Sequence, residues 1–292
     1  MLADRHDWAF DFKAQSVSRC LADEFDVQIA YVRDQPDLSS MDLDLLYVFF
    51  WGETYHREFD LDPSRVVKEI SSHRWANESD YGYLTPAQAA RKYLADAGTI
   101  TSTSKRLVNT FAPYREVHYT PNGFDPDIFR PVGRRSGALR IGWAGDRNDR
   151  CKGLDDILIP AAGEEFELHV AGGEFDRNEM REFYNSIDVI CVASTAEGTP
   201  FPLLEGMACG CFAVAVDVGI VPEVVQSGIN GLVVKRKVAA FRKAFRWCAE
   251  NLEQVRAMGQ QNADAMLRTR TWDRVSIYWR EALQTACDDI EG

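Results

Sequence analysis

The 292-residue chain lacks the marks of several large classes of protein. No run of about 18 apolar residues occurs, so we expect no membrane-spanning helix. The first residues, Met-Leu-Ala-Asp-Arg-His-Asp, lack the pattern of a secretory signal peptide. The seven cysteines do not show the paired spacing of a zinc site. They predict free thiols, which are typical of a cytoplasmic protein.

Cations are scarce as well. Lysine and arginine number 33 against 45 aspartates and glutamates, which gives a net charge of −12. Binding to nucleic acid or to anionic lipid needs a basic surface, so general affinity for either is not expected. An anionic substrate must instead be held by a few cations brought together locally.

Helices and strands are expected to alternate along the chain, which predicts an α/β fold with parallel sheets covered on both faces. Strands are expected at residues 27–32, 45–50, 66–71, 99–103, 117–120, 139–143, 166–170, 189–192, 212–216 and 231–234. Helices are expected at residues 9–22, 86–95, 154–161, 178–185, 203–209, 222–226, 238–250, 252–269 and 272–288.

The segment 129–137 is rich in proline, glycine and charge, and it reads as a linker. The sequence thus predicts an N-terminal domain over residues 1–133 and a C-terminal domain over 134–270. A last helix, 271–292, is expected to pack back towards the first domain. Two such domains would leave a cleft, with the carboxyl ends of their strands pointing into it.

Residues 197–205 read Glu-Gly-Thr-Pro-Phe-Pro-Leu-Leu-Glu. Glu197 lies in a turn, and Glu205 is expected in the first turn of the next helix. A helix N-terminus attracts anions such as a diphosphate, and the two carboxylates could accept hydrogen bonds from sugar hydroxyls. The alternative is that Glu205 only complements the helix dipole.

Two further loops extend this pattern. After the strand 139–143, a loop carries Arg147 and Lys152, which could clamp a diphosphate or could simply form a solvated basic loop. After the strand 212–216, Gly219 permits a close approach of the backbone. Glu223 follows it, and we interpret this residue as complementing a helix dipole.

The order of these motifs resembles retaining glycosyltransferases of family 4, which have the GT-B fold. The resemblance rests on Gly-x-Arg…Lys-Gly, then Glu-Gly-Thr-Pro-x-Pro-Leu-Leu-Glu-Gly-Met-Ala-Cys-Gly, then Val-Gly-x-x-Pro-Glu-Val-Val. Pro-Asn-Gly-Phe-Asp at 121–125 also matches the segment between this family's two domains. The resemblance implies two Rossmann-like domains, of which the N-terminal one is shortened here because only a few residues precede the first helix.

The resemblance also implies roles for individual residues. Arg147 and Lys152 match the residues that bind the donor diphosphate, and Gly145 lies in the same loop. The resemblance also implies that the turn and the start of the next helix contact the donor's sugar and phosphate. These residues are Thr199, Pro200, Phe201 and Leu203.

Glu197 matches the carboxylate near the reacting centre, and Glu205 matches the one that binds the ribose. His73 resembles the family's histidine beside the donor sugar, although a histidine at a strand end is often structural. No metal site is expected, because no Asp-x-Asp pattern lies near the phosphate loop. No cofactor is expected either, because the nucleotide-diphosphate sugar is itself the donor substrate. The Asp-x-Asp patterns at 42–44 and 60–62 read as solvated loops.

The acceptor is left open by the sequence, as are the donor sugar, the base and the oligomeric state. Aromatic residues between Trp51 and Tyr83 could stack on an acceptor, and His6, Trp8 and Phe10 could line its site or belong to the core. The leading hypothesis is a retaining glycosyltransferase. A GT-B protein that binds nucleotide sugars without transfer, or an epimerase-like enzyme, is the alternative.

Overall fold

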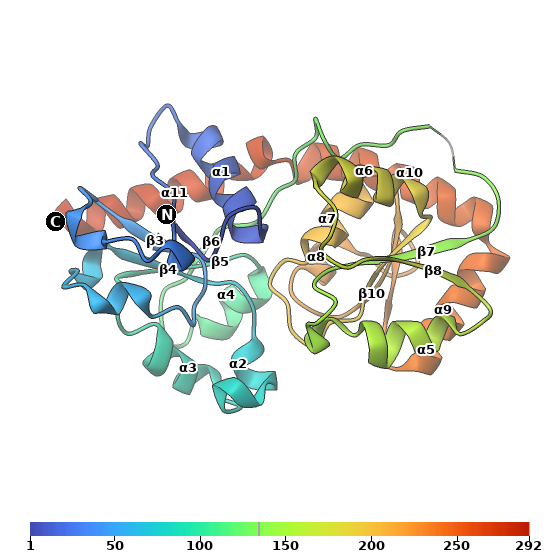
Figure 1. The fold of residues 1–292 in the computed structure, drawn as a ribbon, viewed down its shortest axis with the longest axis horizontal. Coiled ribbons are helices and arrows are strands. Elements are labelled where there is room, and N and C mark those ends of the chain that lie inside the picture. Colours follow the sequence, from blue (N-terminus) through green and yellow to red (C-terminus); the bar gives the residue numbers. More distant parts are fainter. Residues whose placement is uncertain (134, 292) are drawn as a thin grey trace. The chain divides into compact units, whose positions relative to one another are not determined.

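A computed structural model describes residues 1–133 and 135–291, so the predicted linker 129–137 contains one residue, 134, outside the described part (Figure 1). The chain divides into two compact units. Unit 1 comprises Met1–Asn122 together with the C-terminal segment that begins at Trp272, and unit 2 comprises Gly123–Thr271. Each unit is built around its own sheet.

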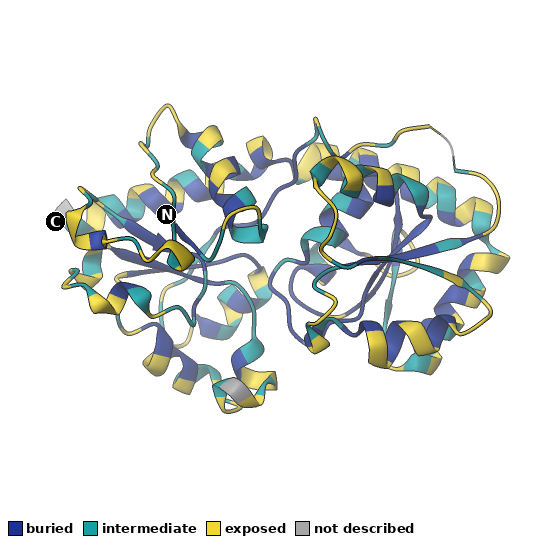
Figure 2. Cartoon of the chain, in the orientation of Figure 1, coloured by how far each residue is buried: buried dark blue, intermediate teal, exposed yellow. Residues whose placement is uncertain are grey.

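The sheet of unit 2 has five parallel strands in the order β11-β10-β9-β7-β8. The strands are β7 (Arg140–Ala144), β8 (Glu167–Ala171), β9 (Val189–Val192), β10 (Phe212–Val216) and β11 (Gly231–Val234). All residues of β9 and β10 are buried, as expected for a parallel sheet covered on both faces (Figure 2). The predicted bounds of β9, β10 and β11 are confirmed.

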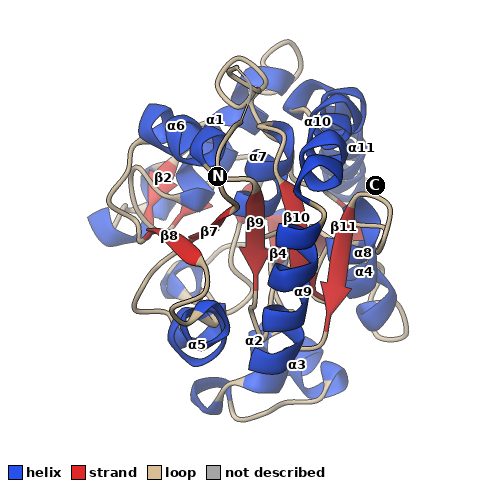
Figure 3. Ribbon diagram, turned by 90° about the vertical axis from the view of Figure 1, so that its right-hand side faces the viewer, coloured by secondary structure: helices blue, strands red, loops and turns tan. Residues whose placement is uncertain are grey.

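Helices cover both faces of this sheet: α5 and α9 lie on one side, and α6, α7 and α10 on the other (Figure 1). They are α5 (Ile159–Ala162), α6 (Arg177–Ser186), α7 (Phe201–Ala208), α8 (Val221–Val224), α9 (Val238–Glu250) and α10 (Leu252–Thr269). Figure 3 shows α9 in front of the adjacent strands β9, β10 and β11. The helical segment predicted at 154–161 is present, but its first part, Leu154–Leu158, is π-helical and runs directly into α5.

The sheet of unit 1 has six parallel strands in the order β2-β1-β3-β4-β5-β6. They are β1 (Leu2–Ala3), β2 (Ala30–Tyr31), β3 (Leu46–Val48), β4 (Val66–Ile70), β5 (Thr99–Ser102) and β6 (His118–Tyr119). The strand β1 has only two residues, which agrees with the few residues that precede the first helix. The six-residue strand predicted at 27–32 is wrong, since only two of its residues pair.

The helices of unit 1 are α1 (Ala9–Leu21), α2 (Arg74–Asn77), α3 (Pro86–Tyr93), α4 (Lys105–Phe111) and α11 (Trp272–Glu291). Helix α4 was not predicted, although Ser104 caps it by accepting from the backbone of Leu107. Helix α11 packs beside α1, where Arg280 pairs with Glu24.

A fully buried ion pair lies in the core of unit 1. Lys13 of α1 donates to Glu69 of β4 across 2.5 Å, and both side chains have an exposed fraction of 1% or less. Tyr47 also donates to Glu69, and the ring of Trp279 lies 4.8 Å from the lysine Nζ. The pair thus ties α1, the sheet and α11 together.

The seven cysteines are free thiols, as predicted. Within residues 1–133 and 135–291, no helix is long and apolar enough to cross a membrane.

Candidate donor site

The loops that follow β7, β9 and β10 meet at one edge of the sheet of unit 2, because all its strands are parallel. From β7 the chain first goes to β8 on one side, and then returns to β9 on the other side. Ligands of open α/β sheets bind at such a reversal, outside the carboxyl ends of the strands. The ends of β7 and β9 therefore mark the candidate site from topology alone.

Two predicted site residues meet at this reversal. Lys152, from the loop after β7, donates to Oε1 of Glu197, from the loop after β9, across 2.6 Å. Ser194 donates to the same oxygen across 2.7 Å. The glutamate side chain is 8% exposed and the lysine side chain 25% exposed. The carboxylate is thus fixed by two donors while it remains at the surface of the site.

Close approaches of the backbone hold these loops together. A Cβ at Gly153, which has φ +76°, would collide with the carbonyl oxygen of Ala193. A Cβ at Gly219, which has φ +48°, would collide with the carbonyl oxygen of Gly198. The N–H of Ile220 donates to that same oxygen across 2.8 Å. Both positions therefore require glycine, because the backbone has a positive φ and there is no room for a Cβ atom.

The other basic residue of the predicted clamp, Arg147, is exposed. Its loop begins at Gly145, where a Cβ would lie 3.1 Å from the Trp143 ring. The arginine side chain runs past Gly172, the residue after β8, since a Cβ built there would lie 3.4 Å from its Cβ. Arg147 and Lys152 thus come from one loop beside the reversal.

Helix α7 begins beside this loop at Phe201, with Pro200 before it and Pro202 after it. Neither proline has an N–H, and the N–H of Leu203 donates to the carbonyl of Pro200 across 3.0 Å. This helix start therefore offers a ligand fewer backbone donors than most. The hydroxyl of Thr199 is buried and makes no hydrogen bond to any described residue.

Glu205 is the fifth residue of α7, so it lies in the second turn. The prediction of the first turn is wrong, because the helix begins two residues earlier than expected. Its Oε2 accepts a hydrogen bond from the hydroxyl of Tyr184, on α6, across 2.8 Å. Burial raises the pKa of Glu205 to about 7.

Two residues outside this cluster complete the predicted set. Glu223, on α8, forms an ion pair with Arg270 across 3.3 Å, so complementing a helix dipole is not its only role. His73, in unit 1, follows β4 and precedes α2, with its ring 6.3 Å from that of Trp75. Sequence reasoning did not single out Ser194 or Tyr184, although each lies in or beside a predicted element.

Comparison with known proteins agrees with this site. Residues 161–265 match the family model described as glycosyl transferases group 1. The matched region includes β8 to β11 and both glutamates of the site, so this part of the chain is similar to group 1 glycosyl transferases.

Among curated proteins, the chain is similar to alpha-maltose-1-phosphate synthase of Mycobacterium tuberculosis. The two are 27% identical over 217 residues, which cover 60% of this chain and 56% of the relative. This chain thus spans little more than half the length of that relative.

Solved structures extend the likeness to both units. Sucrose-phosphate synthase from Thermosynechococcus elongatus has a TM-score of 0.69 at 16% identity, over 85% of this chain and 74% of the other. HepE from Anabaena, in complex with UDP and glucose, has a TM-score of 0.58 at 15% identity, over 75% and 71% of the two chains. The predicted α/β fold of GT-B type, with two Rossmann-like units, is confirmed.

Proposed function

We propose that this chain is a retaining glycosyltransferase that moves a sugar from a nucleotide-diphosphate sugar to an acceptor still to be identified. The observation that carries the proposal is the pair of Lys152 and Glu197 at the strand reversal of unit 2, 2.6 Å apart. It joins a cation suited to phosphate with a carboxylate suited to sugar hydroxyls. The family match and the structure of HepE in complex with UDP-glucose support the same donor class.

The donor is proposed to lie along the edge of the sheet. The diphosphate would contact Arg147, Lys152 and the loop of Gly145, and would accept a hydrogen bond from the free hydroxyl of Thr199. The Thr199 hydroxyl would thus supply a hydrogen-bond donor in place of the backbone N–H that Pro200 lacks. The sugar would lie against Glu197, and the ribose against Glu205.

Charge development explains why cations are needed here. As the glycosidic bond to the donor breaks, negative charge grows on the leaving diphosphate while the sugar becomes oxocarbenium-like. Arg147 and Lys152 would stabilise that charge more in the transition state than in the ground state, which is what accelerates the reaction. We propose no metal for this step, and we assign His73 of unit 1 a role beside the donor sugar.

The experiment is a calorimetric titration of UDP, ADP and GDP into the wild-type chain and into Arg147→Ala and Lys152→Ala. Both variants should weaken binding of the accepted nucleotide by about tenfold or more, the size of one lost charge-assisted contact. Arg150→Ala is the matched control, because Arg150 is an exposed cation of the same loop outside the predicted clamp. Equal affinity in all four proteins would reject the clamp.

Transfer itself is tested separately with the corresponding nucleotide sugars. The wild-type chain should release nucleotide diphosphate slowly by hydrolysis and faster with a suitable acceptor, and Glu197→Ala should abolish both. Binding without any release, across a broad panel of acceptors, would favour the alternative of a protein that binds nucleotide sugars without transferring them.

A further inference from the structure

The hydrogen bond between Tyr184 and Glu205 links two helices beneath the candidate donor site. Tyr184 belongs to α6 and has no exposed surface, and its hydroxyl lies 2.8 Å from Oε2 of Glu205 on α7. Its ring packs edge-on against Phe183 and Phe129, with centroids 5.5 and 5.9 Å away. The hydroxyl therefore has one fixed position, and it reaches a residue that the proposed function assigns to the ribose.

We propose that Tyr184 is a positioning residue that fixes the Glu205 carboxylate for the ribose hydroxyls and so makes the site selective for ribonucleotides. The inference rests on the proposed function, because it presupposes a nucleotide in this site. A carboxylate accepts only, and it has two oxygens. With Oε2 held by the tyrosine, Oε1 is directed to accept from the 2′-hydroxyl, and rotation of the carboxylate is restricted.

The surroundings of the carboxylate explain why an anchor is needed. Burial disfavours the charged form of Glu205 and raises its pKa to about 7. The hydroxyl of Tyr184 and the charge of Arg177, at the start of α6, act in the opposite direction. The other titratable neighbour is Cys209, just beyond α7, whose pKa is raised by burial and by adjacent groups. Without the tyrosine hydroxyl, the charged form of Glu205 would lose a hydrogen bond that stabilises it, so the pKa of Glu205 would rise further.

The test uses Tyr184→Phe, which keeps the buried ring and removes only the hydroxyl. The nucleotide diphosphate accepted by the wild-type chain, from among UDP, ADP and GDP, is titrated next to its 2′-deoxy form. In the wild type, the ribonucleotide should bind about tenfold more tightly, the value of one hydrogen bond to a charged group. In Tyr184→Phe this ratio should fall to about threefold or less, because the weakened acceptor no longer distinguishes the two sugars.

Two further measurements separate positioning from general damage. The pH at which ribonucleotide affinity is half lost on acidification should lie near 7 in the wild type and at a higher value in Tyr184→Phe. Glu205→Gln should lower the ribose-to-deoxyribose ratio as well, and the double variant should not lower it further, since both changes act through one contact. Tyr31→Phe is the matched control, because Tyr31 donates to Asp11 across 2.9 Å in unit 1.

The outcomes are distinct. If the wild-type chain binds none of the nucleotides, the proposed function fails. If it binds them but Tyr184→Phe keeps the tenfold ratio and the wild-type pH midpoint, the inference about Tyr184 is overturned while the proposed function stands. An equal loss of affinity for both sugars in Tyr184→Phe also overturns it, because that pattern signals structural damage rather than loss of ribose recognition.

Discussion

Lys152 and Glu197 form an ion pair with 2.6 Å between Nζ and Oε1, although the sequence assigned them to different parts of a donor. Because the lysine is a quarter exposed and the glutamate is nearly buried, the lysine can turn towards a phosphate while Ser194 still holds the carboxylate. Binding of the diphosphate would then weaken the hold of the lysine on Glu197.

We expect Glu197→Gln to lower the rate of sugar transfer by about 100-fold or more, a size typical for losing one electrostatic group of an active site. Affinity for the nucleotide diphosphate alone should change little, because this side chain is assigned to the sugar. Steady-state kinetics and calorimetry check the two parts. Glu164→Gln, at an exposed position of unit 2, is the control and should leave both quantities as in the wild type.

The contact of Gly219 with Gly198 predicts a loss of both stability and nucleotide binding on substitution. In Gly219→Ala, the new Cβ would collide with a carbonyl oxygen and would also require a left-handed backbone. The free energy of unfolding should fall by about 2–3 kcal/mol, because backbone strain adds to the steric conflict. Gly228→Ala is a matched control, because Gly228 has φ +83° and open space around it. A similar loss in both variants would show that backbone conformation, and not the contact between the loops, is responsible.

The buried pair of Lys13 and Glu69 predicts a strongly asymmetric response to mutation. Lys13→Met should destabilise the chain by about 3–5 kcal/mol, because it leaves a buried carboxylate without its cation. The combined change Lys13→Met with Glu69→Leu should recover most of that loss, since no charge is then buried. Chemical denaturation of the three proteins at neutral pH measures both effects. A double variant less stable than Lys13→Met would contradict this account.

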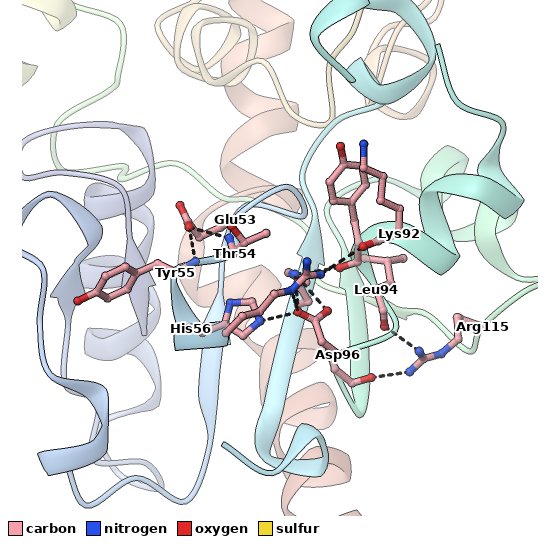
Figure 4. Close-up of polar contacts among 12 residues, drawn as sticks. Glu53, Thr54, Tyr55, His56, Lys92, Leu94, Asp96 and Arg115 are labelled. Atoms are coloured by element: carbon pink, nitrogen blue, oxygen red, sulfur yellow. Dashed lines mark hydrogen bonds and ion pairs between the residues drawn. The ribbon is translucent and has the colours of Figure 1, made fainter. Parts of the chain in front are cut away.

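The contacts of Asp96, in unit 1, should make the stability of the protein depend on pH. His56 donates to the Asp96 carboxylate across 2.8 Å (Figure 4). Arg57 donates to the same carboxylate across 2.6 Å, and the Nζ of Lys68 lies 3.3 Å from it. Burial by itself raises the pKa of Asp96, but the two hydrogen bonds and the lysine charge outweigh it and hold the pKa well below its usual range.

A lowered pKa means that the folded state binds this proton less readily than the unfolded chain does. The contribution of Asp96 is therefore fully present above a pH of about 4, the ordinary pKa of aspartate, and is lost as the pH falls below it. Asp96→Asn should thus be less stable than the wild type at pH 7, and the difference should narrow on acidification to about pH 3. Thermal unfolding across this range checks the trend. Asp60→Asn, at an exposed position nearby, should show no such narrowing.

Helix α11, near the C-terminus, packs within unit 1 and is expected to stabilise this N-terminal unit. Trp279 has no exposed surface, and its indole N–H donates to the carbonyl of Pro121 across 2.8 Å. Trp279→Ala should destabilise unit 1 by about 3–5 kcal/mol through loss of a large buried side chain. Tyr278→Ala is the control, since Tyr278 is the preceding residue and is 42% exposed. Equal losses of stability in the two variants would show that the burial of Trp279 is not the cause of the destabilisation.

Most of unit 2 could be predicted from the sequence, because its signals are local. Runs such as Phe212–Val216 are apolar and end in turn residues, and helices such as Val238–Glu250 carry a clear apolar stripe. Unit 1 was harder to predict. Its strands β1, β2 and β6 have two residues each, too few for any periodic pattern, and α4 has only seven residues.

By itself, the sequence determined the alternation of strands and helices, the net charge of −12, and which residues to expect at the candidate site apart from Ser194 and Tyr184. These follow from composition and from short-range pattern. Only the tertiary structure decided that Lys152 pairs with Glu197, that Tyr184 anchors Glu205 and that Glu223 pairs with Arg270. Such contacts join residues 21 to 47 positions apart. The order of strands in the sheet brings them together, and no local pattern encodes that order.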